Sequence, residues 1–344
     1  MLSDFGGFPA SRPQAVYGVS DLEGLRDRVR DCVARGQPMR SRCFGHSMNG
    51  MAVPRRDELL LDLAGVRHLT WNGRGSITVG AGLAVWELDQ YVRQFGWKLP
   101  VANDGGGSAS SVGGFIAAGG IGEGCMFYGG FWETVSSMVV VTAAGEAIRI
   151  DGRNPLFPWM FGSLGALAVV YEAVIKLVPA SNARPRPVPD MDSLPEGPRA
   201  VWPPHLWLTL FVRPDQRKDA IACLAGLADN NPDVWRRRSA YEYFLQHRGF
   251  NPPLIFEPAV NFIALGVWGD RSEEDHDLQG YIAMEAEFQA IVEARGWRRY
   301  YQSELIRDRR PLDNYVGSAC ADAFRRVKAA CDPAGLLNAF MAPA

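Results

Sequence analysis

The sequence has few features of a membrane, secreted or metal-binding protein. No stretch approaches the roughly 18 consecutive apolar residues that a membrane-spanning helix needs. The first nine residues have neither a basic start nor an apolar core, so we expect no signal peptide. The six cysteines and five histidines are scattered without metal-ligand spacing. We therefore predict reduced thiols, a cytoplasmic location and no metal.

An excess of one charge is also lacking. The 36 lysines and arginines nearly balance the 38 aspartates and glutamates, which leaves a net charge of −2. The two signs are mixed along the chain, which argues against nucleic acid or an anionic membrane as a partner. We expect a small-molecule substrate, and the sequence leaves the oligomeric state open. A chain of 344 residues is long enough for two domains with their own cores.

Residues 42–50, Arg-Cys-Phe-Gly-His-Ser-Met-Asn-Gly, form the most informative short segment. Its glycines and serine permit a turn in which backbone N–H groups approach a phosphate. His46 stands in the middle of this turn. The pattern indicates a phosphate-bearing cofactor held by the main chain, although a surface turn with a solvated histidine would have the same sequence.

A second glycine-rich segment covers residues 104–122. Nearly every side chain in it is small, whereas a core strand would carry larger side chains. A solvent-exposed linker would not contain Val112, Phe115, Ile116 and Ile121. We therefore expect this segment to pack against something other than side chains.

The rest of the chain alternates between helical and strand patterns. In the first part we expect a helix that starts at a capping box over 20–23 and ends at Gly36, and these further elements: strand 76–82, helix 85–96, a hairpin of 135–143 and 147–150, and strand 169–178. A proline-rich stretch over 179–204 is typical of a linker. After it we expect strand 206–212, helix 215–227, strand 259–268, helix 273–295, strand 298–302 and helix 318–330.

Two further blocks accompany the glycine-rich segments: residues 154–179, and Asp-Pro-Ala-Gly-Leu-Leu-Asn at 332–338. With these four blocks in order, the chain resembles the vanillyl-alcohol-oxidase or PCMH type of FAD-binding flavoprotein. Cytokinin dehydrogenases, alditol oxidases and decaprenylphosphoryl-ribose oxidases belong to it. The resemblance implies an α+β fold with a two-subdomain PCMH-type FAD-binding domain and a smaller α+β cap domain. We expect the FAD-binding domain over 1–180, the cap over 181–300, and a C-terminal segment over 301–344 that returns to the FAD-binding domain.

The resemblance implies FAD as the cofactor. His46 matches the position at which many members attach the flavin covalently, so we expect covalent FAD through His46; in some relatives the flavin is noncovalent and the ring would only pack against it. The positions that match FAD-binding residues of the family are Cys43, Gly45, His46, Ser47, Met51, Asp104, Ser111, Gly113, Gly114, Ala117, Ile121, Val170 and Asn338.

Two residues are candidates for catalysis. Asp104 matches the aspartate that accepts a proton in cytokinin dehydrogenases, and a carboxylate beside a buried flavin suits a general base. Alternatively Asp104 caps the glycine turn through its own backbone. Tyr300 falls where ribose-oxidising relatives place a tyrosine, but Ser303 replaces the lysine that follows it there. Tyr300 therefore either lines the site or packs on the sheet of the cap.

Other side chains of the expected cap have simpler interpretations. The run Arg236 to Arg238 is typical of a solvated face. Tyr241, Tyr243, Phe244 and Phe250 suit packing within the cap, although a planar substrate would also suit them.

The function implied by the resemblance is an FAD-linked oxidase or dehydrogenase. Such an enzyme moves a hydride from a C–H bond next to an alcohol or amine to flavin N5, and oxygen or another acceptor reoxidises the flavin. The short cap would suit a bulky natural-product intermediate. One alternative is an NADPH-dependent flavin reductase of the enolpyruvyl-reductase kind. Another is a redox-silent protein with the FAD fold that acts in binding or cyclisation.

Overall fold

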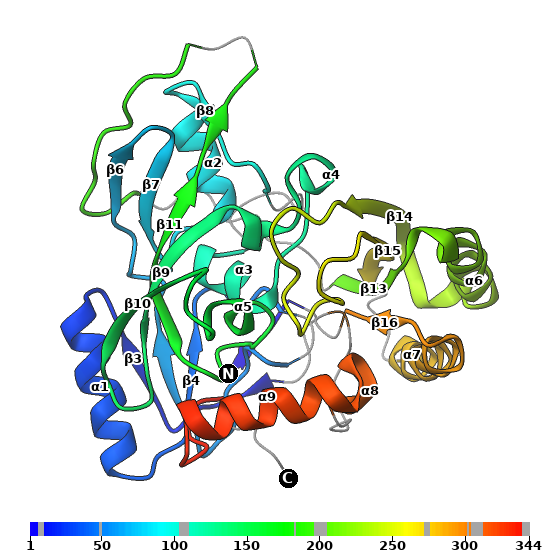
Figure 1. Cartoon of the computed structure of the whole chain (residues 1–344). Helices are drawn as coiled ribbons and strands as arrows, with labels where there is room; N and C mark the ends of the chain where they lie inside the picture. Colours follow the sequence, from blue (N-terminus) through cyan, green and yellow to red (C-terminus); the bar gives the residue numbers. More distant parts are fainter. Residues whose placement is uncertain are drawn as a thin grey trace.

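The computed structural model describes residues 1–5, 10–47, 50–102, 110–181, 184–195, 205–271, 276–300, 303 and 312–338. Helices combine with separate parallel and antiparallel sheets, in agreement with the expected α+β class (Figure 1). No helix in the described part is long and apolar enough to cross a membrane.

The first sheet is parallel and has the strand order β3-β5-β4. Its strands are β3 (Ala15–Gly18), β5 (Leu59–Asp62) and β4 (Met39–Arg42). Helix α1 (Leu22–Ala34) connects β3 to β4 and buries Leu25 and Val29 against the sheet. The carboxylate of Asp21 accepts a hydrogen bond from the Gly24 backbone at 2.8 Å, so Asp21 rather than Ser20 caps the helix. A short pair, β1 (Leu2–Ser3) and β2 (Ala10–Ser11), precedes this sheet.

The second sheet is antiparallel, with the order β10-β9-β11-β7-β6. Its strands are β10 (Ala147–Asp151), β9 (Val135–Val141), β11 (Val169–Lys176), β7 (Ser76–Gly80) and β6 (Leu69–Gly73). The predicted hairpin is confirmed, because Ala147 pairs with Val141. The elements around this sheet are α2 (Val85–Arg93), β8 (Trp97–Lys98), α3 (Val112–Ala118), α4 (Cys125–Tyr128), η1 (Phe131–Glu133), α5 (Phe157–Met160) and β12 (Val178–Pro179).

The third sheet, the cap sheet, has the antiparallel order β14-β15-β13-β16. Its strands are β14 (Trp235–Leu245), β15 (Phe262–Arg271), β13 (His205–Val212) and β16 (Arg298–Arg299), and the helical segments beside it are η2 (Pro214–Gln216), α6 (Arg217–Asn230), η3 (Pro232–Val234) and α7 (His276–Arg295). Figure 1 shows α6 and α7 on the outer side of this sheet. Strand β14 was not expected from the sequence.

The two faces of the cap sheet pack against different partners. Leu206, Leu208 and Leu210 of β13 belong to a core with residues of α6 and α7. The alternate residue Phe211 belongs to the core that contains the second sheet. The period of two along the strand therefore decides which side chains face the rest of the molecule.

The C-terminal segment packs beside the first sheet. It contains α8 (Asp313–Val316) and α9 (Ser318–Cys331). After α9, the Met39 backbone of β4 donates to Leu336 O at 2.8 Å, and the Asn338 backbone donates to Met39 O at 2.9 Å. The Lys328 ammonium group, which is buried, joins Ala166 O to Leu337 O with hydrogen bonds of 2.7 Å each.

Candidate functional site

A cavity of about 380 Å³ lies between the loop after β4, helix α3, the segment before β11 and the cap sheet. This volume is within the range of small-molecule sites. The predicted site residues that line it are Cys43, Gly45, His46, Ser47, Met51, Ser111, Gly113, Gly114, Ala117, Ile121, Val170 and Tyr300. Asn338 does not line it, and Asp104 lies outside the described residues.

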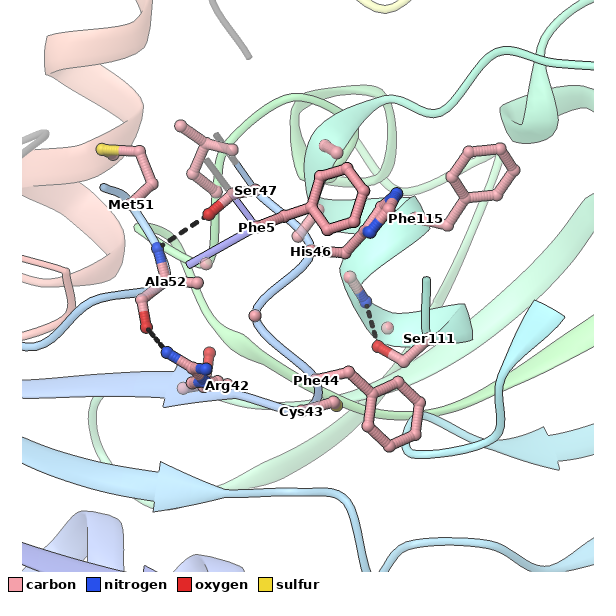
Figure 2. Close-up of a pocket in the computed structure, with 18 of the residues that line it drawn as sticks. Phe5, Arg42, Cys43, Phe44, His46, Ser47, Met51, Ala52, Ser111 and Phe115 are labelled. Carbon is pink, nitrogen blue, oxygen red and sulfur yellow. Dashed lines mark hydrogen bonds between the residues drawn. The ribbon is translucent and has the colours of Figure 1, made fainter. Parts of the chain in front are cut away.

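The loop after β4 bends over a guanidinium group. Gly45 has φ +71°, and a Cβ there would lie 2.3 Å from Nη2 of Arg42. Only glycine allows this contact without displacing the arginine. Arg42 donates to Ala52 O at 3.0 Å (Figure 2) and also to Ser3 O at 2.8 Å. Burial lowers the pKa of Arg42, and the neighbouring carboxylate of Asp4 opposes this shift.

The far end of the loop is fixed by a buried ion pair. Arg40 bonds both oxygens of Glu58 at 2.8 Å, and its Nη1 donates to Met51 O at 2.6 Å. The hydroxyl of Ser47 accepts a hydrogen bond from the Ala52 backbone at 3.2 Å. The loop is therefore held at both ends by side chain to backbone bonds.

His46 lies in the wall of the cavity between the N-terminal segment and the cap sheet. Its ring centroid is 4.3 Å from that of Phe5 and 6.3 Å from that of Trp207. Figure 2 shows the Phe5 and His46 rings side by side. The Phe5 backbone donates to Ser47 O at 3.0 Å, and Asp4 accepts from the Gly50 backbone at 2.6 Å. The imidazole thus faces a cavity rather than only solvent.

Part of the second glycine-rich segment is helical. Ser111 caps α3 by accepting a hydrogen bond from the Gly114 backbone at 3.0 Å (Figure 2). A Cβ on Gly113 would lie 2.8 Å from Cβ of Ala81, so glycine lets the helix start directly against the chain that follows β7. Gly114 is exposed, and it lines the cavity.

The wall next to β11 is also made of small residues. It includes Ser163, Gly165, Ala168 and Val170. Asn338 supports this wall from behind, because its amide donates to Leu164 O at 2.6 Å. The Asn338 side-chain oxygen is buried and has no hydrogen-bond partner among the described residues.

Tyr300 lines the cavity and also packs against the cap sheet, so both of the roles considered from the sequence apply to it. Its ring lies 5.3 Å from that of Phe211, and its hydroxyl donates to Ala118 O at 3.1 Å. The side chain is 7% exposed, and this burial raises the pKa of Tyr300 far above its usual range. The phenol therefore stays protonated, which suits a hydrogen-bonding residue and not a base.

Ser303, at the position of the missing lysine, is a structural residue. Its hydroxyl donates to Tyr300 O at 2.7 Å and accepts from the Thr209 backbone at 3.0 Å. It is fully buried and does not line the cavity.

Three lining residues had not been singled out from the sequence, Phe5, Trp207 and Trp268, and two more, Tyr241 and Tyr243, had been interpreted mainly as packing. Tyr241 and Tyr243 alternate with smaller or polar residues, and this period of two could have predicted the strand on which they lie. Phe5 had no local signal, since it reaches the site only through tertiary packing. No carboxylate is among the described residues that line the cavity.

Comparison with known proteins identifies the first part of the chain. Residues 13–151 match a family model described as an FAD binding domain. The chain is 26% identical over 225 residues to a D-arabinono-1,4-lactone oxidase of Eremothecium gossypii, which covers 63% of this chain and 42% of the relative. It is 29% identical over 150 residues to a D-lactate dehydrogenase of Archaeoglobus fulgidus, over 41% of this chain and 33% of the relative.

A third relative is an alditol oxidase of a Streptomyces species, 34% identical over 138 residues, or 40% of this chain and 32% of the relative. The matches thus span less than half the length of each of these curated relatives.

The cavity fits the cofactor that this match implies. Its walls near His46, α3 and β11 consist largely of glycine, alanine and serine, so main chain would make most contacts with a bound group. A buried, unsatisfied Asn338 oxygen behind one wall is a further polar group available near that surface. The family match, the relatives and the glycine-lined cavity agree: residues 13–151 match an FAD binding domain, and the chain is similar over this region to FAD-linked oxidases and dehydrogenases.

Proposed function

We propose that the protein oxidises a small molecule at a C–H bond next to an alcohol or amine and leaves a carbonyl or imine. FAD, when bound, supplies the redox chemistry by accepting the hydride at N5 and passing electrons to oxygen or another acceptor. One observation carries the proposal: a single cavity has the FAD-domain loops on one side and the aromatic residues of the cap sheet on the other. A substrate held by the cap side would therefore face a cofactor held by the loops.

We propose that residues 1–180 form the FAD-binding unit with two subdomains, that 181–300 form the cap, and that 301–344 return to the FAD-binding unit. The backbone bonds between Met39 and the segment Leu336–Asn338 support this last assignment. The proposed FAD contacts are the loop and wall residues that line the cavity, with Asn338 behind the wall and Asp104 in the second glycine-rich segment.

His46 is the proposed covalent attachment site. Its position in the cavity wall, between Phe5 and Trp207, supports this role. Acid precipitation of the purified protein tests it, because a covalent flavin stays yellow in the pellet. The His46→Ala variant should release the colour into the supernatant. Yellow that washes out of the wild type would refute the tether and leave FAD binding intact.

Asp104 is the proposed proton acceptor, and Tyr300 is proposed to orient the substrate by accepting a hydrogen bond at its hydroxyl oxygen, because its proton is donated to Ala118 O. Substitution Asp104→Asn should lower kcat with little effect on FAD content. Tyr300→Phe should raise KM more than it lowers kcat, because the phenol binds and does not ionise.

The function as a whole is tested by anaerobic reduction of the bound flavin. The protein as purified should be yellow, and a panel of primary alcohols and amines should bleach it without NADPH. Fast bleaching by NADPH alone would favour a reductase. Folded protein that takes up no FAD at micromolar concentration would refute the proposal.

A further inference from the structure

The inner face of the cap sheet presents a row of aromatic rings to the cavity. Trp207 of β13, Tyr241 and Tyr243 of β14, and Trp268 of β15 all line it, and we call these four residues the aromatic platform. Trp207 and Trp268 are directly paired across β13 and β15. The Tyr241 and Tyr243 rings lie 5.4 Å apart. Aromatic rings at such spacing form a surface on which another ring can stack.

The position of the Tyr241 ring in the platform depends on one glycine. Gly266 of β15 pairs with Tyr241 of β14 on one side and with Thr209 of β13 on the other. The Tyr241 and Thr209 hydroxyls are hydrogen-bonded to each other. The Tyr241 side chain must therefore cross strand β15, since the backbones of β14 and β13 lie roughly 10 Å apart.

The Tyr241 ring makes this crossing directly over the backbone of Gly266. A Cβ at residue 266 would lie 2.3 Å from Cζ of the Tyr241 ring. Real Cβ atoms do not approach this closely, and the ring is also tied to Thr209, so it cannot move aside without losing that bond. Any side chain at 266 would push the ring into the cavity. Gly266 thus sets the shape of the platform although it contributes no side chain.

The platform has little to offer a charged ligand. The inner-face residues of the cap sheet between 207–211, 239–245 and 262–268 carry no charged side chain. Among the described lining residues the guanidinium is that of Arg42, which is already bonded to Ser3 and Ala52. A carboxylate on the cap side would be desolvated without a partner there, at a high free-energy cost.

The indole N–H of Trp207 is a polar group of the platform without an acceptor in the described part of the chain. The Trp207 Nε1 atom is buried and has no hydrogen-bond acceptor among the described residues. Buried indole N–H groups normally find a partner. A ligand oxygen placed at the edge of the Trp207 ring, in the plane of the indole, would supply it.

We propose that the cap recognises an uncharged molecule with a planar, conjugated ring, which stacks on the aromatic platform, and that Gly266 and Tyr241 determine this specificity. The inference names the substrate class for the proposed oxidoreductase and so rests on that proposal. It sets this chain apart from its matched relatives, whose names point to an aldonolactone, a hydroxy acid and alditols.

The test is isothermal titration calorimetry of the FAD-loaded protein with 2-naphthylmethanol. Its saturated analogue, decahydro-2-naphthylmethanol, has similar bulk and the same hydroxyl but no planar ring. The platform predicts binding of the naphthyl compound about tenfold tighter than the saturated one, the order expected of aromatic stacking. Xylitol and D-lactate should bind more weakly than both. Equal affinities for the two bicyclic alcohols, or tighter binding of xylitol or D-lactate, would overturn the inference.

Variants locate the effect. Gly266→Ala and Tyr241→Leu should each weaken 2-naphthylmethanol binding about tenfold, and Tyr241→Phe, which keeps the ring, should weaken it less than either. Trp71→Phe is the control, because Trp71 packs on Trp97 outside the cavity. Circular dichroism checks that each variant is folded; if Gly266→Ala is not, Trp207→Leu replaces it with the same expected loss. Unchanged binding in both Tyr241→Leu and Trp207→Leu would refute the platform.

Anaerobic reduction separates this inference from the proposed function. Reduction of bound flavin by xylitol or D-lactate, without measurable binding of the naphthyl alcohol, would keep the function and refute the platform. Tight, ring-dependent binding in a protein that holds no FAD would refute the function and keep the platform.

Discussion

The buried lysine of α9 offers the sharpest test of what holds the cavity wall in place. Lys328 is 1% exposed and donates to Ala166 O, Leu337 O and the carboxylate of Asp332. Asp332 also accepts from the backbones of Leu336 and Leu337, at 3.1 and 2.7 Å. Desolvation lowers the pKa of Lys328, and the bond to Asp332 opposes this shift. The pair therefore links the wall before β11 to the C-terminal segment through one ammonium group.

The perturbation is Lys328→Met, which keeps most of the length of the side chain and removes its charge. It leaves Asp332 as a buried charge without its cation, and leaves two carbonyls without a donor. Breaking a buried pair from one side costs about 3–5 kcal/mol. The double variant Lys328→Met with Asp332→Asn should cost less than the sum of the two single variants, with a coupling of about 1–3 kcal/mol.

The assay is urea unfolding followed by far-ultraviolet circular dichroism, with FAD content measured on the same samples. Arg35→Met is the matched control, since Arg35 pairs with Asp31 on the exposed face of α1 and should have little effect. A loss under about 1 kcal/mol in Lys328→Met, or strict additivity in the double variant, would show that the pair does not hold the wall as argued.

Three further predictions concern the loop, the cap and the second sheet. Gly45→Ala should lower the free energy of unfolding by about 1–3 kcal/mol and weaken FAD retention on gel filtration, because the new Cβ would clash with Arg42 and residue 45 has a positive φ. A variant with the stability and FAD retention of the wild type would contradict this. The raised pKa of Tyr300 means that its contribution to stability is present below pH 10 and is lost as the pH rises further, so Tyr300→Phe should flatten alkaline unfolding curves. The hydrogen bond from His68 lowers the pKa of Glu172, so the contribution of Glu172 to stability is present above pH 4.5, its ordinary pKa, and is lost as the pH falls below that value. Glu172→Gln should therefore make the urea midpoint depend less on pH in the acid range. An unchanged dependence of the midpoint on pH would contradict the assignment.

Local patterns in the sequence were sufficient for much of the fold. The β-branched run from Val135 and the turn at Gly145 predicted the hairpin of β9 and β10, because both signals act between neighbours in the chain. The starts of the main helices were likewise set by nearby residues, with Asp21 in place of Ser20 at α1 as a shift of one residue.

Strand β14 could not be recognised in the same way. Its first residues include the run Arg236 to Arg238, which has the composition of a solvated segment. The strand is stabilised by pairing with β15, from which it is separated in sequence by the segment up to Phe262. Such a pairing depends on contacts that no local window contains.

The site was predicted unevenly for the same reason. The composition of the two glycine-rich segments predicted a wall that faces a ligand. The described residues of both segments meet at one cavity. Asn338 was predicted to bind FAD; in the structure it supports the wall through its hydrogen bond to Leu164 O and does not line the cavity. Phe5 reaches His46 from the N-terminal end through a tertiary contact, which has no signature in the sequence.

The crossing of Tyr241 over Gly266 has an evolutionary consequence. A tyrosine at 241 can cross strand β15 only while residue 266 has no side chain, so residue 266 cannot gain a side chain while Tyr241 is kept. Homologues that keep Tyr241 should therefore keep Gly266, whereas Gly266 can remain after Tyr241 is lost. Their joint presence in descendants would then mark which members of the family inherited this cap surface.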